Sequence, residues 1–171
     1  VVVEQSGLVD LVYNDFYIGE DSDVQIIAGC GIHNDGLHLS QHDGIHTFHV
    51  GKNARVKYVE KHYGEGGGTG ARVLNPVTRV YLEEGSYLEM DTVQIEGVDS
   101  TDRVTEGTVG DGATLIVHEK LMTSGTQTAT TTFAVDLNGR DSSANITSRS
   151  VAKGESVQKF LSKTHGNNAC M

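Results

Sequence analysis

The sequence is poor in residues that mark several common protein classes. Among its 171 residues are one proline, no tryptophan and two cysteines, Cys30 and Cys170. Two cysteines are too few for the disulfide framework of a small secreted domain, so we expect a reducing compartment and a cytoplasmic protein. Aromatic residues make up 6% of the chain, which is little for a protein that stacks sugar rings on its surface.

Basic residues and long apolar runs are scarce as well. The 13 Lys and Arg face 23 Asp and Glu, and the formal net charge is −10. Nucleic-acid binding needs clustered basic side chains, so we expect no nucleic-acid partner. No apolar run approaches the roughly 18 residues that cross a bilayer, and no charged-then-apolar leader is evident, so we expect no membrane association.

Motifs that would indicate an enzyme are missing from the sequence. The glycine-rich stretch 64–70 lacks the Gly-Lys-Ser/Thr ending of a P-loop, and we interpret it as a flexible connection. There is no Gly-x-Ser-x-Gly elbow and no His-Glu-x-x-His motif. The pattern therefore predicts no catalytic residues for nucleophilic hydrolysis or zinc proteolysis.

A nine-residue phrase recurs along the chain. Its copies begin at Ile18, Val50, Leu82, Val109 and, more loosely, Val151, with a blurred copy at Leu137. The first, seventh and usually ninth positions are apolar, a period of two that is typical of a half-buried strand. The fourth position is Asp, Asn or Gly, which readily accept a positive φ. The phrase therefore predicts the end of a strand, a sharp corner and a new strand.

The spacing of the phrase favours stacked rungs. The five clearer copies begin 32, 32, 27 and 42 residues apart, near multiples of about 14, which is one strand and one corner. Such a unit cannot bury its apolar face alone, whereas stacked parallel units share a core. We therefore predict an all-β fold, a parallel β-helix with little helix, in which residues 1–171 form a single domain. A β-sandwich or jelly roll is the alternative, because its turns also use Gly and Asn.

Since the chain begins Val-Val-Val and ends Ala-Cys-Met, we expect a piece of a longer protein.

The densest group of potential ligands lies between Cys30 and His49, where five of the eight histidines occur. Imidazole and thiolate are the usual ligands of iron, zinc and copper, so a metal role is a hypothesis for this segment. Solvent-facing strand positions or buried turns are the alternative. The candidate metal ligands, including two from the C-terminal tail, are His33, His38, His46, His49, His165 and Cys170. Period two places His46 and His49 on opposite faces, so we do not expect them to share one ion.

Carboxylates are dense between residues 83 and 102. A sugar-cleaving β-helix would need a pair of them in one groove. Strand alternation predicts instead that most of them face solvent.

Family-specific motifs occur along nearly the whole chain. They include Gly29-Cys30 followed by Ser40-Gln41-His42, then Gly-Lys-Asn-Ala-Arg-Val-Lys-Tyr at 51–58, Leu74-Asn75, Thr123-Ser124-Gly125 and the stretch 136–163. In these motifs and their order the chain resembles the SufB/SufD family, the scaffold subunits of the SUF machinery that assembles iron–sulfur clusters. The resemblance implies a right-handed parallel β-helix core. It also makes Cys30 similar to the cysteine implicated in passing sulfur toward the cluster site, and His42 similar to the histidine that follows it.

The resemblance implies a scaffold rather than an enzyme, with the ATPase and desulfurase activities in its partners. The expected partners are an ABC-type ATPase resembling SufC, a SufB/SufD-like paralogue or a second copy of the chain, and sulfur donor proteins. An iron–sulfur cluster is expected only transiently, in the full-length complex, because the family's second key cysteine would lie beyond Met171. Two other functions stay open from the residues alone: a carbohydrate-active β-helix protein and a mononuclear metal-binding protein.

Overall fold

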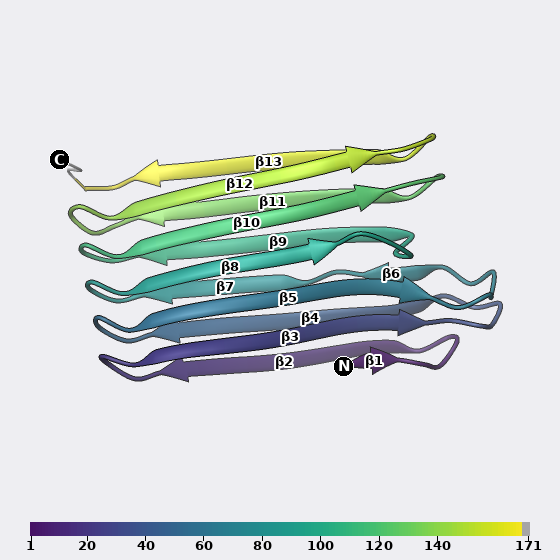
Figure 1. Cartoon of the computed structure of the whole chain (residues 1–171), viewed down its shortest axis with the longest axis horizontal. Coiled ribbons are helices and arrows are strands. Elements are labelled where there is room, and N and C mark those ends of the chain that lie inside the picture. Colours follow the sequence, from purple (N-terminus) through teal and green to yellow (C-terminus); the bar gives the residue numbers. More distant parts are fainter. Residues whose placement is uncertain (169–171) are drawn as a thin grey trace.

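Two parallel sheets face each other, and the chain winds between them as a β-solenoid of about six turns (Figure 1). The computed structural model describes residues 1–168. Strands make up 67% of the described residues, which contain no helix, and every strand pair among them is parallel. The prediction of a parallel β-helix is confirmed, and the alternative of a sandwich is wrong because sandwich strands pair in antiparallel fashion.

Successive strands alternate between the two sheets. In spatial order, the first sheet contains β1 (Val2–Val3), β3 (Asp23–His33), β5 (Arg55–Glu65), β8 (Tyr87–Gln94), β10 (Thr114–Thr123) and β12 (Ser143–Ala152). The second sheet contains β2 (Val9–Ile18), β4 (Ser40–Val50), β6 (Arg72–Leu74), β7 (Val77–Leu82), β9 (Ser100–Val109), β11 (Thr128–Leu137) and β13 (Val157–Gly166). The strands β6 and β7 share one rung, both paired with β4 and β9, and are separated at Pro76, which has no N–H to donate to a ladder.

The corners predicted from the repeated phrase have the expected backbone. Its fourth position adopts a positive φ in all five clearer copies, at Asp21, Asn53, Gly85, Gly112 and Gly154. The small residue that follows is buried in most copies, and at Ser86 the hydroxyl donates a 2.7 Å hydrogen bond to the carbonyl of Glu83. These corners turn the chain from one sheet to the other within four residues.

The first position of the phrase builds one row of the core. Ile18, Val50, Leu82 and Val109 are register partners on successive rungs, and the row continues to Leu137. The blurred copy therefore belongs to this row, although its positive φ falls one residue later, at Asp141, because its corner is one residue longer.

The loose copy at Val151 does not belong to that row. Val151 is half exposed, and its corner joins β12 to β13 at the opposite end of the solenoid (Figure 1). The sequence pattern alone could not distinguish the two ends, because both need a tight turn.

The interior changes character along the strands. Near the phrase corners it is an apolar core that includes Phe48, Tyr58 and Phe133, all 1% exposed or less. Further along, inward positions hold polar groups, namely His42, His46, Glu60, His62, Gln94, Thr101, Arg103, Glu119 and Thr131. A second, smaller apolar cluster contains Val3, Cys30, Ile32, Leu74 and Val98. Buried polar groups cost stability unless they are paired, so this polar section needs a structural or functional explanation.

Candidate functional site

Cys30 is a buried thiol in the wall of the solenoid. It lies on β3 with 5% of its surface exposed, and strand alternation turns it inward with Ala28 and Ile32. Its register partner on the neighbouring strand β5 is His62. Two residues earlier on β5, Glu60 also points inward, as alternation requires.

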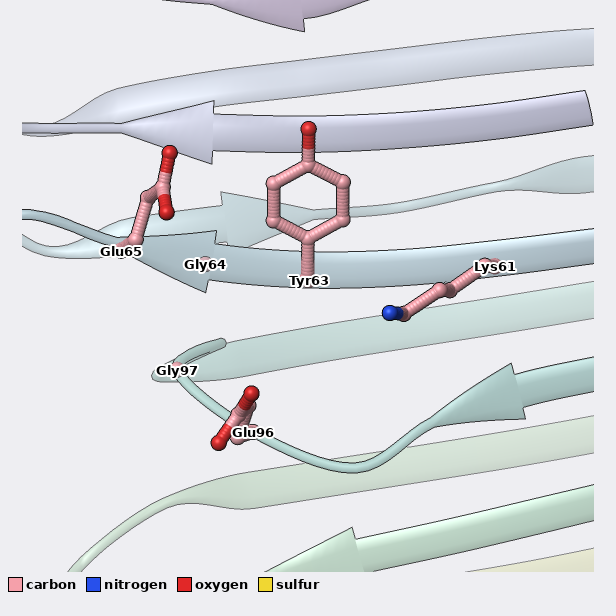
Figure 2. A pocket seen from close by; sticks show the side chains of 6 residues that line it. All are labelled: Lys61, Tyr63, Gly64, Glu65, Glu96 and Gly97. Carbon is pink, nitrogen blue, oxygen red and sulfur yellow. The ribbon is translucent and has the colours of Figure 1, made fainter.

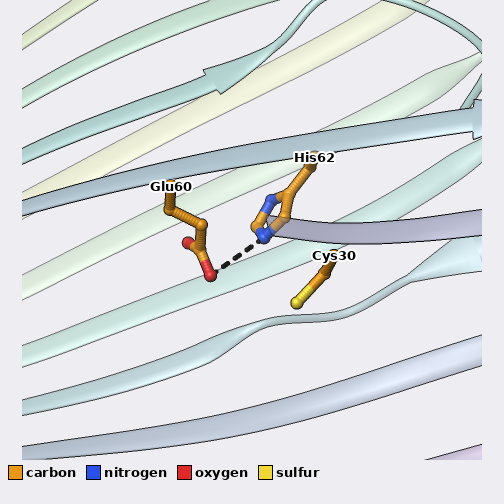
Figure 3. Close-up of side chains that lie close together, drawn as sticks. All are labelled: Cys30, Glu60 and His62. Atoms are coloured by element: carbon orange, nitrogen blue, oxygen red, sulfur yellow. Dashed lines mark ion pairs between the residues drawn. The ribbon is translucent and has the colours of Figure 1, made fainter. Parts of the chain in front are cut away.

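Cys30, Glu60 and His62 form one buried group (Figure 3). Their potential ligand atoms all lie within 4.8 Å of one another. His62 Nε2 is 3.1 Å from Glu60 Oε1, yet its N–H is not aligned with that oxygen, so Nε2 has no well-directed hydrogen-bond partner. The group thus offers a thiol, a carboxylate and an imidazole with spare hydrogen-bonding capacity.

The surroundings of the thiol keep it protonated. Burial and the nearby carboxylate of Glu60 raise the pKa of Cys30 to about 11. Burial would also raise the pKa of Glu60, but the polar groups beside it, first the His62 imidazole and then the Arg103 guanidinium, outweigh burial, and that pKa lies below its ordinary value. Cys30 is therefore a neutral thiol beside an ionised carboxylate at neutral pH.

Burial favours the neutral form of two of the interior histidines, His46 and His62. Burial, the largest cause, lowers the pKa of both His46 and His62, although Glu60 acts in the opposite direction on each. His46 Nδ1 is 2.9 Å from the Tyr58 hydroxyl, which donates a 2.9 Å hydrogen bond to Glu60 Oε1. Since that hydroxyl has one proton to donate, His46 Nδ1 must be the donor in the first contact.

The polar section continues across the interior through Arg103. Its Nη2 donates to His62 Nδ1 at 2.7 Å, and its Nε lies 3.7 Å from Glu119 Oε2. Thr131 and Ser148 donate hydrogen bonds to the two oxygens of Glu119. The network thus joins strands of both sheets and extends from His62, beside the thiol, to Ser148 on β12.

A comparison with protein families identifies the chain that carries this network. Residues 16–169 match the family model described as the SufBD core domain of the SUF system for FeS cluster assembly. The chain belongs to the SufBD core family. The resemblance seen in the sequence is thereby confirmed, and the protein takes part in SUF iron–sulfur cluster assembly. Searches of curated proteins and of solved structures gave no match.

Of the residues that the sequence singled out, His42 and His46 lie in the interior of this SufBD core. His42 is 2% exposed, and its Nδ1 is 2.7 Å from Asp10 Oδ2. The two histidines follow Cys30 in the chain but point inward from β4, which belongs to the opposite sheet.

The other predicted ligands are dispersed. His33 lies at the end of β3 between Asp35 and Glu65, His38 lies in the loop after it, and His165 faces Asp136. His49 points outward, opposite to His46 as expected, and stacks between Tyr17 and Tyr81. Cys170 lies outside the described residues. No described group of three potential ligands contains any of these histidines, so their metal role stays a prediction.

A second group of side chains that could bind a metal ion lies on the outer wall of the SufBD core. Glu89, Asp91 and His118 approach one another there, but both carboxylates form ion pairs with Lys57. Lys57 contacts both carboxylates and balances one of their two negative charges, so they do not form a free carboxylate pair for sugar cleavage.

The outer wall also has a pocket of about 530 Å³ (Figure 2). Lys61, Tyr63 and Glu65 line it from β5, and Glu96 and Gly97 line it from the segment after β8. Because alternation points Lys61 and Tyr63 away from the interior, this pocket does not include the buried thiol.

In the described residues no helix is long and apolar enough to cross a membrane.

Proposed function

We propose that this protein is a scaffold subunit of the SUF machinery in which Cys30 accepts sulfur on its way to a nascent iron–sulfur cluster. The observation that carries the proposal is the position of Cys30 inside a SufBD core, within 4.8 Å of Glu60 and His62. A thiol is the group that forms and breaks sulfur–sulfur bonds, and an enclosed site protects the product from water and oxidants.

The proposed step is an exchange between a thiol and a persulfide. The Cys30 sulfur attacks the outer sulfur of a donor persulfide, the sulfur–sulfur bond of the donor breaks, and a new one forms on Cys30. The proton lost by Cys30 ends on the released donor thiolate. No net oxidant or reductant is needed, and Glu60 is the buried carboxylate close enough to relay that proton.

Access to Cys30 passes through the short strand β1. Val3 of β1 packs in the same apolar cluster as the thiol, and β1 pairs with Gly31 and Ile32, the residues directly after it. We propose that a sulfur donor reaches Cys30 when β1 moves aside.

The other parts of the proposal rest on family membership. The scaffold would work with an ABC-type ATPase resembling SufC, with a SufB/SufD-like partner or a second copy of itself, and with a persulfide-bearing donor protein in the cytoplasm. The cluster is cargo rather than a resident cofactor, and catalysis belongs to the partners.

The test is sulfur transfer from a cysteine desulfurase supplied with labelled cysteine. Mass spectrometry after alkylation should find a persulfide on Cys30 in the wild-type chain and in Cys170→Ser, and none in Cys30→Ser. Val3→Ala, which thins the cover of the thiol, should accelerate the transfer. Label that accumulates only on Cys170, or equally in Cys30→Ser, would overturn the proposal.

A further inference from the structure

Arg103 lies between the thiol site and the opposite wall. It comes from β9 of the second sheet, is 5% exposed, and contacts His62 of β5 at one end and Glu119 of β10 at the other. A buried arginine with two polar neighbours is costly to desolvate, and its geometry is therefore informative.

The contact with Arg103 determines which nitrogen of His62 carries the proton. A guanidinium has only donors and stays charged, so His62 Nδ1, at 2.7 Å from Nη2, must accept. A neutral imidazole has one proton, which must then be on Nε2. This nitrogen is the one that faces Glu60 and belongs to the group with Cys30.

The same proton blocks a metal ion. A histidine that ligates a metal normally donates its other N–H to a carboxylate or carbonyl, which leaves a lone pair for the metal. His62 has the reverse arrangement, because its Nδ1 accepts a hydrogen bond from the Arg103 guanidinium and the proton is therefore on Nε2. Cys30, Glu60 and His62 have the side-chain types and spacing of a three-ligand metal site. The His62 nitrogen that faces the other two residues nevertheless carries a proton, so it has no lone pair for a metal ion.

A protonated His62 Nε2 can donate a hydrogen bond to anionic sulfur. Its N–H is buried and without an aligned acceptor, and the Cys30 sulfur belongs to the same group. A thiolate or the terminal sulfur of a persulfide would accept a hydrogen bond from this donor, and hydrogen bonds to charged acceptors are the stronger kind.

We infer that Arg103 is a positioning residue that keeps His62 an Nε2–H donor and so makes the Cys30 site select anionic sulfur over a divalent metal ion. The selection of sulfur rests on the proposed function, whereas the exclusion of metal does not. Glu119 supports Arg103, because Thr131 Oγ1 and Ser148 Oγ donate to its two oxygens at 3.2 and 2.7 Å and fix the carboxylate.

The first measurement is the ¹⁵N NMR spectrum of His62 in the wild-type chain, assigned with His62→Gln. We expect a protonated Nε2 and an unprotonated Nδ1. A proton on Nδ1 would overturn the inference, and this result needs no variant of Arg103 to fold.

The second measurement is titration with Co²⁺, whose bond to a thiolate gives a charge-transfer absorption. Arg103→Met combined with Glu119→Gln removes both buried charges together and avoids an unpaired carboxylate. We expect this double variant to bind Co²⁺ at least about tenfold more tightly than wild type, with absorption that is lost on adding Cys30→Ser. Arg103→Lys with Glu119 intact, which restores a cationic donor, should bind like wild type.

Equal Co²⁺ affinity in wild type and a folded double variant would contradict the inference. Neither measurement uses a sulfur donor. A failure of persulfide transfer to Cys30 would therefore count against the proposed function alone.

Discussion

Cys30 and His62 are register partners on β3 and β5, so a thiol and an imidazole occupy the same position on two adjacent rungs. Glu60 lies two residues before His62 and faces the same interior. The carboxylate therefore acts on the thiol at short range through a medium of low polarity, where charges interact more strongly than in water.

This relationship predicts how alkylation of Cys30 depends on pH. In a Cys170→Ser background, the rate with iodoacetamide should rise only toward the pKa of about 11, above the ordinary value of about 8.5. Glu60→Gln removes a negative charge that disfavours the thiolate, so its profile should move to lower pH. Glu65→Gln, the same substitution at an exposed position of β5, is the control and should not move the profile. An unchanged profile in Glu60→Gln would show that burial alone sets the reactivity.

The Tyr58 hydroxyl offers a test of the buried network. Tyr58→Phe leaves His46 Nδ1 and Glu60 Oε1 without their shared partner, and such loss in an interior costs about 1 to 3 kcal/mol of unfolding free energy. Tyr87→Phe removes a hydroxyl that donates to Glu89 on the outer wall, and we expect a change within about 0.5 kcal/mol. Urea unfolding of both variants measures the difference. Equal losses of unfolding free energy in the two variants would mean that the interior hydrogen bonds contribute no more to stability than the one on the outer wall.

Much of the fold could be predicted from the sequence because the repeated phrase encodes local geometry. Alternation defines inward positions, and a positive φ selects Gly, Asn or Asp wherever it is needed. The row from Ile18 to Val109 and its corners follow directly. Val151 fits the same pattern although its corner lies at the other end of the solenoid, because a tight turn needs the same residue types at either end.

The site was only partly predictable. A family motif identifies Cys30, whereas none of the sequence motifs identifies Glu60, His62 or Arg103. A signal for His62 existed, since the first copies of the phrase are 32 residues apart and His62 follows Cys30 by the same interval. Arg103 has no such signal. It is 41 residues from His62 and reaches it across the interior from the opposite sheet, a contact that no repeat spacing specifies.

The buried histidines predict a loss of stability in acid. The unfolded chain binds a proton at each histidine below about pH 6.5, whereas the pKa of folded His46 is lower, so protons favour the unfolded chain. The groups around His46 are Asn14 from β2, Tyr58 and Glu60 from β5, and His42 from its own strand. The unfolding free energy should therefore fall as the pH falls from about 7 to 5.

Replacement of His46 by Gln should flatten this dependence by at most about 1.4 kcal/mol per pH unit, the slope of one proton. His33→Gln should act in the opposite direction. Hydrogen bonds to Asp35 and Glu65 raise the pKa of this exposed histidine, and the stability it adds below pH 6.5 is lost as the pH rises through its folded value. Denaturant unfolding at several pH values measures both slopes. A His46→Gln slope equal to that of wild type would place the acid sensitivity elsewhere.

The phrase corners can be tested with two glycines that differ in one property. A methyl group added at Gly112 or at Gly67 would meet no atom within 4 Å, so neither substitution causes a clash. Gly112 has a φ of +61°, which costs a residue with a side chain about 1 to 2 kcal/mol, whereas Gly67 does not have a left-handed φ. Gly112→Ala should therefore lower the unfolding free energy by about 1 kcal/mol, while Gly67→Ala should leave it equal or slightly higher, because alanine restricts the unfolded chain. Thermal unfolding followed by circular dichroism compares the two. If both alanine variants were equally stable, the positive φ at the fourth position of the phrase would not be the reason for its glycine.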